Sequence, residues 1–440
     1  MKQSPIFTVL GLGPSGTVAA HRAAQRGLEV VGIDPRGVNA PSTVGLWASQ
    51  LPRWFPREAV ASRFRPALIT PAGTRILTSE YVVLSPGWEQ VLDGFEVVRE
   101  KAWPGVGMKY SLSFDGNREN PTIQQRISAL KSWFRPNPDE QVSVILDESS
   151  SPGQLSHLLV SVPQVTMKAH QVAYGMVVPE NAVPDTQRQG VLMDFSPLPG
   201  YTDSNPVTFS YRIPLGDGTW LIEETILATT GDPATLLPHL EEKNSARLQH
   251  LGISGEHILR SEVVVFPLGP RRLPDDRPRT RLGLALSMIP FLKGAWLDLR
   301  FLAGPWNGRG IPGEAHIGGT AGWIHPATGY SVGTVLAHTD AMLDRVLNGE
   351  TPTPKSWRIN HLLRTLGLNI ILRLSASQYR EFFTIVLGLP EKDLLDYLTC
   401  TNPWVTARVM VRIILREFRS SPSTALAVFR HLPAALIKKP

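Results

Sequence analysis

The pattern of apolar and polar positions at the start of the chain predicts a strand, a glycine-rich turn, a helix and a second strand. Ile6–Leu10 is a short apolar run with β-branched and aromatic residues, which is typical of a buried strand. The stretch Thr17–Arg26 has a helical pattern and is terminated by Gly27. Glu29–Ile33 forms the second apolar run, and Asp34 follows it directly. We therefore expect the first residues to form a strand rather than a signal peptide.

Alternation of residue types in the middle of the chain predicts a β-hairpin. Val207–Ile213 and Thr219–Leu227 alternate enough to be paired strands, and Gly216-Asp217-Gly218 supplies the turn between them. A helix is predicted at Thr334–Leu347, after a glycine-rich cluster. Residues 103–155 are polar, contain Pro and Ser, and match no element that we can place.

The turn after the first predicted strand has the G-x-G-x-x-G spacing of dinucleotide-binding proteins. Gly11 permits the tight turn, Gly13 lets the backbone approach a pyrophosphate, and Gly16 allows close contact between helix and strand. The free N–H groups of the helix N-terminus suit an anion. The cofactor-binding residues predicted here are Gly11, Gly13, Pro14, Ser15, Gly16 and Asp34, the last of which is placed to accept bonds from an adenosine ribose. A glycine-rich turn without a ligand is the alternative.

A second glycine-rich cluster, Gly318–Gly333, leads into the helix at Thr334–Leu347. Such a turn again suits phosphate or the polar edge of a flavin. Two turns of this kind, about 300 residues apart, suit one long dinucleotide held by distant parts of the chain. The N-terminal unit alone does not separate NAD from FAD, although its position favours FAD. From this cluster we predict cofactor contacts by Gly319, Thr320, His325, Pro326, Thr328, Gly329 and Tyr330.

Two of these segments resemble motifs of the lycopene cyclases, which are FAD-dependent carotenoid cyclases. The stretch from His325 to Ser331 reads His-Pro-Ala-Thr-Gly-Tyr-Ser and is similar to their flavin-side motif. Trp220–Leu227 is similar to their F-L-E-E-T-S-L segment. Weaker matches occur in the family's order at Gly45-Leu46-Trp47, at Tyr174-Gly175 with Met193-Asp194-Phe195, and at Glu262 with Pro267-Leu268-Gly269. The resemblance covers about residues 6–345 and extends more loosely into the tail.

The resemblance implies an enzyme that cyclises the acyclic end groups of lycopene or a close carotenoid without net redox change. It implies reduced FAD as the active cofactor, NAD(P)H as the reductant, and an apolar isoprenoid substrate. The chain departs from the family pattern at Ser49-Gln50, where Asp-Glu is usual, and at Leu158–Val162, which has no acid or glycine. These departures keep open a cyclase of the same lineage that acts on a non-carotenoid polyene. An FAD-dependent monooxygenase or reductase of an isoprenoid or polyketide also stays open, as does a flavin-binding protein without catalysis.

The pair Glu223-Glu224 is the candidate catalytic group. Cyclisation requires a proton for an unactivated C=C bond, and a carboxyl group stays protonated at neutral pH when an apolar pocket disfavours its charged form. By motif position, we predict Glu223 as the acid/base and Glu224 as its partner. Consecutive strand residues face opposite ways, so one should point inward and the other outward or towards the flavin loop. The alternative is a solvated strand edge with a surface ion pair.

Aromatic residues beside the motifs could face a polyene or a carbocation, since ring faces stabilise cations. We name Trp47 and Trp323 as predicted substrate-binding residues, with plain core packing as the alternative. His325, a loop histidine before proline, is expected to position the loop.

We expect an α/β fold with a Rossmann-like FAD-binding lobe, a mixed β-sheet substrate lobe and a C-terminal helical region. A chain of 440 residues exceeds the usual size of one core, so two or three lobes are expected. The predicted limits are 1–105 with 280–350 for the FAD-binding lobe, 160–275 for the substrate lobe and 355–440 for the helical region, which is a candidate for membrane association.

The net charge and the cysteine content of the chain limit the kinds of partner and metal site that we expect. A net charge of +6 suggests an anionic partner, which a membrane surface, a nucleic acid or a phosphorylated cofactor would satisfy. The basic residues are scattered and no nucleic-acid-binding motif is present, so we expect no nucleic acid. Cys400 is the only cysteine, which excludes an intrachain disulfide and a cysteine-based metal site. We expect no metal.

The tail, Trp357–Phe429, is apolar with regularly spaced arginines. Ile359–Leu374 and Val405–Phe418 are predicted to be amphipathic helices with basic faces, which commonly lie in the interface of anionic membranes. A helical cap packed on the substrate lobe is the alternative. No apolar run is long enough to span a bilayer. We therefore expect a cytoplasmic protein peripheral to the inner face of the membrane.

Overall fold

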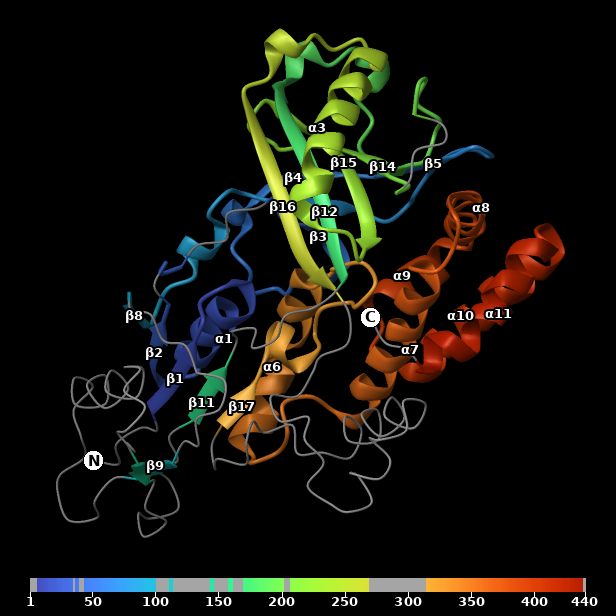
Figure 1. The fold of residues 1–440 in the computed structure, drawn as a ribbon. Coiled ribbons are helices and arrows are strands. Elements are labelled where there is room, and N and C mark those ends of the chain that lie inside the picture. Colours follow the sequence, from blue (N-terminus) through green and yellow to red (C-terminus); the bar gives the residue numbers. More distant parts are fainter. Residues whose placement is uncertain are drawn as a thin grey trace.

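A computed structural model describes residues 6–34, 36–38, 43–99, 111–113, 143–145, 157–160, 169–201, 206–268 and 314–437. It is an α/β structure with a parallel sheet, a larger mixed sheet and a helical C-terminal part (Figure 1). The predicted fold class is therefore confirmed. Most of residues 103–155, for which no element is predicted, and 280–313 of the predicted FAD-binding lobe lie outside the described residues.

The first sheet is parallel and has the N-terminal strand at its centre. Its order is β17 (Glu314–His316), β11 (His157–Val160), β1 (Ile6–Leu10), β2 (Glu29–Ile33) and β8 (Glu96–Val98). All four strand pairs run parallel, as expected of a Rossmann-like sheet with crossover connections. The strand, turn, helix and strand predicted from the first 34 residues are present, with β1 and β2 at their predicted bounds.

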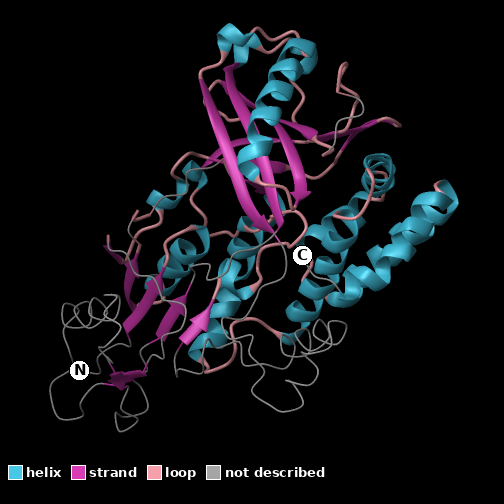
Figure 2. Ribbon diagram, viewed as in Figure 1, coloured by secondary structure: helices cyan, strands magenta, loops and turns pink. Residues whose placement is uncertain are grey.

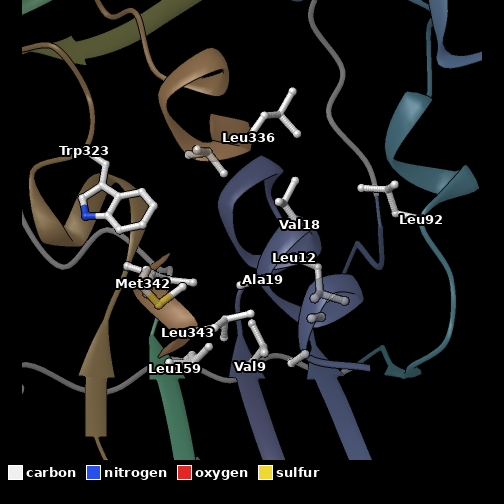
Figure 3. Close-up of a cluster of buried hydrophobic side chains, with 14 of the residues drawn as sticks. Val9, Leu12, Val18, Ala19, Leu92, Leu159, Trp323, Leu336, Met342 and Leu343 are labelled. Carbon is white, nitrogen blue, oxygen red and sulfur yellow. The ribbon is translucent and has the colours of Figure 1, made fainter. Parts of the chain in front are cut away.

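Helix α1 (Pro14–Ala24) packs against α6 (Val332–Leu347), so the two ends of the predicted cofactor site are held together. Arg22 makes two hydrogen bonds to the carboxylate of Asp340, at 2.9 and 3.2 Å. The core beneath these helices combines side chains from β1, β11, α1 and α6, as Figure 3 shows. Its fully buried members include Phe7, Val9, Leu12, Val18, Leu159 and Leu343.

The second sheet has seven strands and is mixed. Its order is β16 (Arg260–Leu268), β12 (Ala169–Pro179), β15 (Thr219–Thr229), β14 (Phe209–Pro214), β13 (Val191–Asp194), β5 (Ala67–Thr70) and β6 (Gly73–Ile76). The predicted hairpin is present as β14 and β15. Strands β5 and β6 belong to residues 1–105 of the predicted FAD-binding lobe, yet they pair in this second sheet. The predicted lobes therefore differ here from the sheets of the structure, and the domain limits as a whole stay a prediction.

Helix α3 (Pro233–His250) covers one face of this sheet and packs on β12 and β15 (Figure 1). Asn244 on this helix donates hydrogen bonds to the carbonyls of Ile222 and Tyr174, at 2.9 and 3.1 Å. The opposite face of the sheet borders the cavity described below.

Shorter elements complete the fold. A three-stranded antiparallel sheet has the order β3 (Gly45–Trp47), β7 (Tyr81–Leu84) and β4 (Val60–Phe64), and β9 (Ser111–Ser113) pairs with β10 (Ser143–Ile145). The 3-10 helices are η1 (Ala48–Gln50), η2 (Arg57–Ala59), η3 (Trp88–Val91), η4 (Glu180–Ala182), η5 (Asp185–Gln187), η6 (Gly255–His257) and η7 (Gly318–Ala321).

The tail is helical, and Figure 2 shows its helices gathered beside the strand-rich part. They are α7 (Lys355–Ile371), α8 (Ala376–Leu387), α9 (Glu391–Thr399), α10 (Pro403–Ser420) and α11 (Pro422–Ile437). Phe383 of α8 stacks on Phe195 at 5.3 Å between ring centroids. The tail therefore packs on the second sheet's lobe. Among the described helices, none combines the length and apolarity needed to cross a bilayer.

The arginines of α7 are not exposed, contrary to the predicted basic face, whereas Arg408, Arg412, Arg416 and Arg419 of α10 are exposed as predicted. On α7, Arg358 is buried and Arg364 donates to the carbonyl of Cys400 at 2.7 Å. On α10, Arg408 forms an ion pair with Asp396 at 3.0 Å, and Arg412 pairs with Asp393 of the same neighbouring helix. Arg408 and Arg412 thus join α10 to α9, and Arg364 joins α7 to Cys400, which directly follows α9.

Candidate active site

A cavity of about 520 Å³ joins the elements that carry the predicted motifs. It extends from Gly13 and Pro14 of the glycine-rich turn, along the face of the seven-stranded sheet opposite α3, to α8, α9 and α10. Most of its lining is apolar, and several aromatic rings contribute. Those rings are Trp47, Tyr81, Phe209, Tyr211, Tyr330, Phe382, Phe383 and Tyr397. The described part of the chain thus brings both predicted cofactor turns and one predicted catalytic residue to a single cavity.

The glycine-rich turn has the geometry that its sequence predicts. Gly11 has a φ of 85°, in the left-handed region that favours glycine. A Cβ on Gly16 would overlap the carbonyl oxygen of Gly11, so only glycine allows α1 to approach β1 this closely. A Cβ on Gly13, by contrast, would meet no atom within 4 Å. Gly13 and Pro14 line the cavity, whereas Ser15 and Gly16 lie in the first turn of α1 without lining it.

The carboxylate of Asp34 is tied to the glycine-rich turn. Its Oδ2 accepts a hydrogen bond from the N–H of Leu12 at 3.0 Å, and its Oδ1 accepts one from the N–H of Arg36 at 2.9 Å. Asp34 therefore fixes the end of β2 against the turn. A bond from its remaining lone pairs to a ribose stays a prediction.

The His-Pro-Ala-Thr-Gly-Tyr-Ser segment forms a closed turn at the N-terminus of α6. The N–H of His325 donates to the carbonyl of Tyr330 at 2.8 Å, and the carbonyl of His325 accepts from Gly329 at 2.9 Å. The His325 ring is buried against Tyr397, and this burial holds its pKa well below the usual value. Within this segment, Thr328, Gly329 and Tyr330 line the cavity while His325 and Pro326 support the turn from behind.

The remaining predicted cofactor residues of this cluster lie further back. Gly319 and Thr320 belong to η7. Gly319 does not line the cavity, and the side chain of Thr320 is outside the described residues. Their contact with a cofactor stays a prediction.

Tyr330 links this segment to the Gly45-Leu46-Trp47 segment. Its hydroxyl donates to Oε1 of Gln50 and accepts a hydrogen bond from the backbone N–H of Trp47 at 3.2 Å. Gln50 is one of the two positions where the sequence departs from the family pattern. The departure therefore falls on a direct neighbour of the flavin-side motif, which spacing along the chain did not reveal.

The two predicted substrate-binding tryptophans have different environments. Trp47 lines the cavity and packs edge-on against Tyr81, with 5.1 Å between ring centroids. Trp323 belongs to the same core cluster as side chains of α1 and α6 (Figure 3), and its Nε1 donates to Thr353 Oγ1 at 2.9 Å. It does not line the cavity, so core packing explains Trp323 and contact with substrate does not.

Glu223 lies on the cavity wall, among the alternate residues of β15 that face this side: Leu221, Glu223, Thr225 and Leu227. Its Oε1 accepts a hydrogen bond from Thr225 Oγ1 at 2.6 Å. Burial raises the pKa of Glu223 to about 7, and this effect outweighs the opposing hydrogen bond from Thr225. The side chain can therefore carry a proton at neutral pH, as the sequence predicts for a general acid.

Glu224 lies on the other face of the sheet, beneath α3. Its Oε1 accepts a hydrogen bond from Arg247 Nε at 2.8 Å, and its Oε2 accepts one from Thr208 Oγ1 at 2.6 Å. Both Glu224 and Arg247 are buried. Glu224 thus belongs to a buried ion pair that holds α3 on the sheet, and its predicted role as the partner of Glu223 does not fit this position. A solvated strand edge, the alternative, is wrong for both residues.

Glu262 and Tyr211 also line the cavity, and the sequence singled out neither as a site residue. Gly175 of β12 is the register partner of Glu223 on one side and of Glu262 on the other, while Tyr211 is the partner of Glu223 across β14. Glu262 appeared only in a weak family match. The signal that could have identified it is alternation along 260–268, which gives Glu262 the same face as Val264.

Comparison with known proteins assigns the family. The model of the lycopene cyclase protein family matches residues 143–290 and 302–427, more than half of the chain. Lycopene beta cyclase of Synechococcus elongatus is 23% identical over 94% of this chain and 93% of its own length. The chloroplastic lycopene beta cyclase of Arabidopsis thaliana is 24% identical over 87% and 72%.

The chain is also similar to an uncharacterized cyclase and to a solved flavoprotein structure. An uncharacterized carotenoid cyclase of Deinococcus radiodurans is 24% identical over 93% of this chain and 89% of its own length. Among solved structures, a flavoprotein/dehydrogenase from Cytophaga hutchinsonii is 11% identical, with a TM-score of 0.48 over 95% of this chain and 100% of that chain. On the match of the family model, the chain belongs to the lycopene cyclase protein family and is an enzyme of that family.

Proposed function

We propose that this protein catalyses the redox-neutral, proton-initiated cyclisation of the acyclic end groups of lycopene or a close carotenoid. The observation that carries the proposal is the Glu223 carboxyl group, which faces an apolar cavity and whose pKa burial raises to about 7. A hydrocarbon has no group that hydrogen-bonds a carboxylate. A buried acid in such a cavity therefore suits proton donation better than recognition of a polar substrate.

The reaction begins with transfer of the Glu223 proton to the terminal C=C bond of the end group. The resulting tertiary cation is attacked by a neighbouring double bond, which closes the ring, and loss of a ring proton restores neutrality. General acid catalysis of this kind contributes about 100-fold to 10,000-fold in rate. Trp47, Tyr81 and Tyr211 line the same cavity, and the faces of aromatic rings stabilise a nearby cation.

The glycine-rich turn and the second motif fit an FAD molecule. Open space over Gly13 admits a pyrophosphate, since no atom lies within 4 Å of the position of its missing Cβ. Residues 328–330 line the cavity beside that turn and would lie along the flavin. When bound, reduced FAD would supply an electron-rich ring that stabilises positive charge. NAD(P)H as its reductant is part of the proposal.

We also propose that α10 attaches the protein to a membrane surface. Its exposed apolar side chains are Trp404, Val411, Leu415 and Phe418, which recur at helical spacing on one face. Trp404 is 82% exposed, an unusual position for so large a ring. The opposite face of α10 carries Val409 and Ile413, which line the cavity. One helix thus separates the cavity from an apolar surface, as suits a substrate dissolved in lipid. A cytoplasmic location stays a prediction.

An anaerobic assay tests the proposed function. Purified protein in liposomes that contain lycopene is supplied with FAD and NADPH, and the pigments are separated by chromatography. Appearance of cyclised carotenoid without stoichiometric loss of NADPH is the expected result. Unchanged lycopene beside bound, reducible flavin would refute the proposed substrate. Stoichiometric consumption of NADPH and oxygen in a parallel aerobic assay would indicate a monooxygenase.

A further inference from the structure

A second carboxylate lies in register with Glu223 on the cavity side of the sheet. Glu262 of β16 and Glu223 of β15 flank Gly175 of β12, which is the register partner of both. Because Gly175 has no side chain, nothing on the intervening strand separates the two carboxyl groups on this face. A Cβ on Gly175 would lie 2.7 Å from Cδ1 of Leu221 and 3.6 Å from Oε2 of Glu223, so a larger residue here would crowd the side of the sheet on which Glu223 lies.

The two carboxyl groups have contrasting partners. Glu262 accepts hydrogen bonds from both the backbone N–H and the hydroxyl of Thr43, at 2.8 and 2.9 Å. Arg260 approaches the same carboxylate at 3.5 Å. Two donors and a cation contact the Glu262 carboxylate, whereas Glu223 has one hydroxyl donor and an apolar surround. Paired acids whose surroundings differ in this way take opposite roles in proton transfer.

We propose that Glu262 is the catalytic base of the cyclisation, so that Glu223 and Glu262 act as an acid/base pair across Gly175. This inference rests on the proposed function and extends it to a residue outside the Glu223-Glu224 motif. A carboxylate offers about four lone-pair sites, so the two bonds from Thr43 leave capacity to accept a proton. Glu262 itself lines the cavity, so it can meet the reacting end group.

The proton count balances without any oxidant or reductant. The O–H bond of Glu223 breaks as a C–H bond forms at the end of the chain, and a C–C bond then closes the ring. A ring C–H bond next to the cation breaks, its electron pair forms the ring double bond, and the proton passes to Glu262. Return of that proton from Glu262 to Glu223 restores the starting state. The position of the base selects which C–H bond breaks, and hence the position of the double bond.

The charged and titratable groups around Glu223 are few on the described elements. Glu262 faces it from β16, Tyr211 from β14 and Tyr81 from β7, and Arg36 and Tyr330 line the same cavity. Glu224 lies behind the sheet in its pair with Arg247. Loss of the charge on Glu262 should therefore favour ionisation of Glu223. This coupling requires only that Glu262 is charged and close to Glu223, so kcat and the ratio of ring isomers distinguish a base from a purely structural Glu262.

The test compares three variants and one control variant in the liposome assay. Glu262→Gln keeps the size of the side chain but removes the base, and we expect kcat to fall about 100-fold with little change in KM. Glu262→Asp should recover part of that loss and change the ratio of ring double-bond isomers. Thr43→Val removes the hydroxyl contact and should cost less than about tenfold. Glu256→Gln, on exposed η6, is the matched surface control.

A second measurement does not need the substrate. Infrared titration of the full-length protein, with the Glu223 band assigned by its loss in Glu223→Gln, should show a midpoint about one pH unit lower in Glu262→Gln. An unchanged midpoint, or equal losses of kcat in Glu262→Gln and Thr43→Val, would overturn the inference. A wild-type protein that cyclises nothing would refute the proposed function and the base role together. An active wild type whose Glu262→Gln variant has the same activity would refute the base role alone.

Discussion

Glu223 and Glu224 are adjacent in the sequence, yet their carboxyl groups lie on opposite faces of β15. Glu223 faces the apolar cavity, and Glu224 is paired with Arg247 beneath α3. The same motif thus supplies one residue to the reaction and one to the attachment of a helix. Substitutions at the two positions should consequently fail in different ways.

Glu223→Gln should abolish turnover and leave the fold intact. The amide cannot donate the proton that initiates cyclisation, although it retains the shape of the side chain. We expect a loss of about 1,000-fold or more in kcat. Product chromatography measures the loss, and the visible spectrum of the flavin shows whether FAD is still bound. A variant with full activity would remove Glu223 from the mechanism.

Glu224→Gln should destabilise the protein without a direct effect on chemistry. Its substitution leaves Arg247 buried without its counter-charge, and breaking one side of such a pair costs about 3 kcal/mol. Urea unfolding measures the change in the free energy of unfolding. The rate per folded molecule should stay near that of the wild type. A stable variant with no activity would contradict this assignment and return Glu224 to the catalytic pair.

The cyclisation rate should fall as the pH rises through about 7. Burial raises the pKa of Glu223 to about 7, and the protonated form is the one that initiates the reaction. Above that pH the active fraction falls about tenfold per pH unit. The pH profile of kcat in liposomes measures this decrease above about pH 7. A rate that stays constant up to about pH 9 would show that a different group donates the proton.

Local signals in the sequence predicted the local structure well. The strand, turn, helix and strand of residues 6–34 follow from glycine positions and short apolar runs, and the β14–β15 hairpin follows from alternation and a glycine-rich turn. Alternation also predicted that Glu223 and Glu224 separate. It could not predict that Glu224 is buried, because Arg247 lies 23 residues further along on a helix whose packing is a tertiary property.

The relationships that the sequence did not reveal depend on contacts between distant segments. The position of Glu262 beside Glu223 requires the register of three strands, and no spacing along the chain fixes that register. The arginines of α10 are exposed as predicted, but the ion pairs of two of them with acids of α9 were not predicted. Trp323 sits next to a motif in the sequence and packs in the core of the first lobe instead.

Gly13→Ala should weaken FAD binding without affecting the fold, whereas Gly16→Ala should lower the stability of the protein. The added methyl group at Gly13 enters open space, so the protein should fold normally and bind FAD weakly. At Gly16 the methyl group overlaps the Gly11 carbonyl, so α1 must shift and stability should fall by about 1–3 kcal/mol. Thermal unfolding without FAD and flavin titration measure the two effects. Tight FAD binding by Gly13→Ala would contradict the proposed approach of the pyrophosphate.

Trp404→Ser and Phe418→Ser should weaken attachment to membranes and leave the fold unchanged. Both side chains are exposed on α10, at 82% and 45%, so their loss removes little packing within the protein. Burial of one such ring in lipid contributes about 1.5–3 kcal/mol, which corresponds to about a tenfold or greater loss of partition for each substitution. Cosedimentation with anionic lipid vesicles measures the partition. Ile76→Ser is the matched control, because Ile76 is 57% exposed on β6, away from α10, and should bind as the wild type does. Equal binding by all three variants would place the membrane contact on another surface.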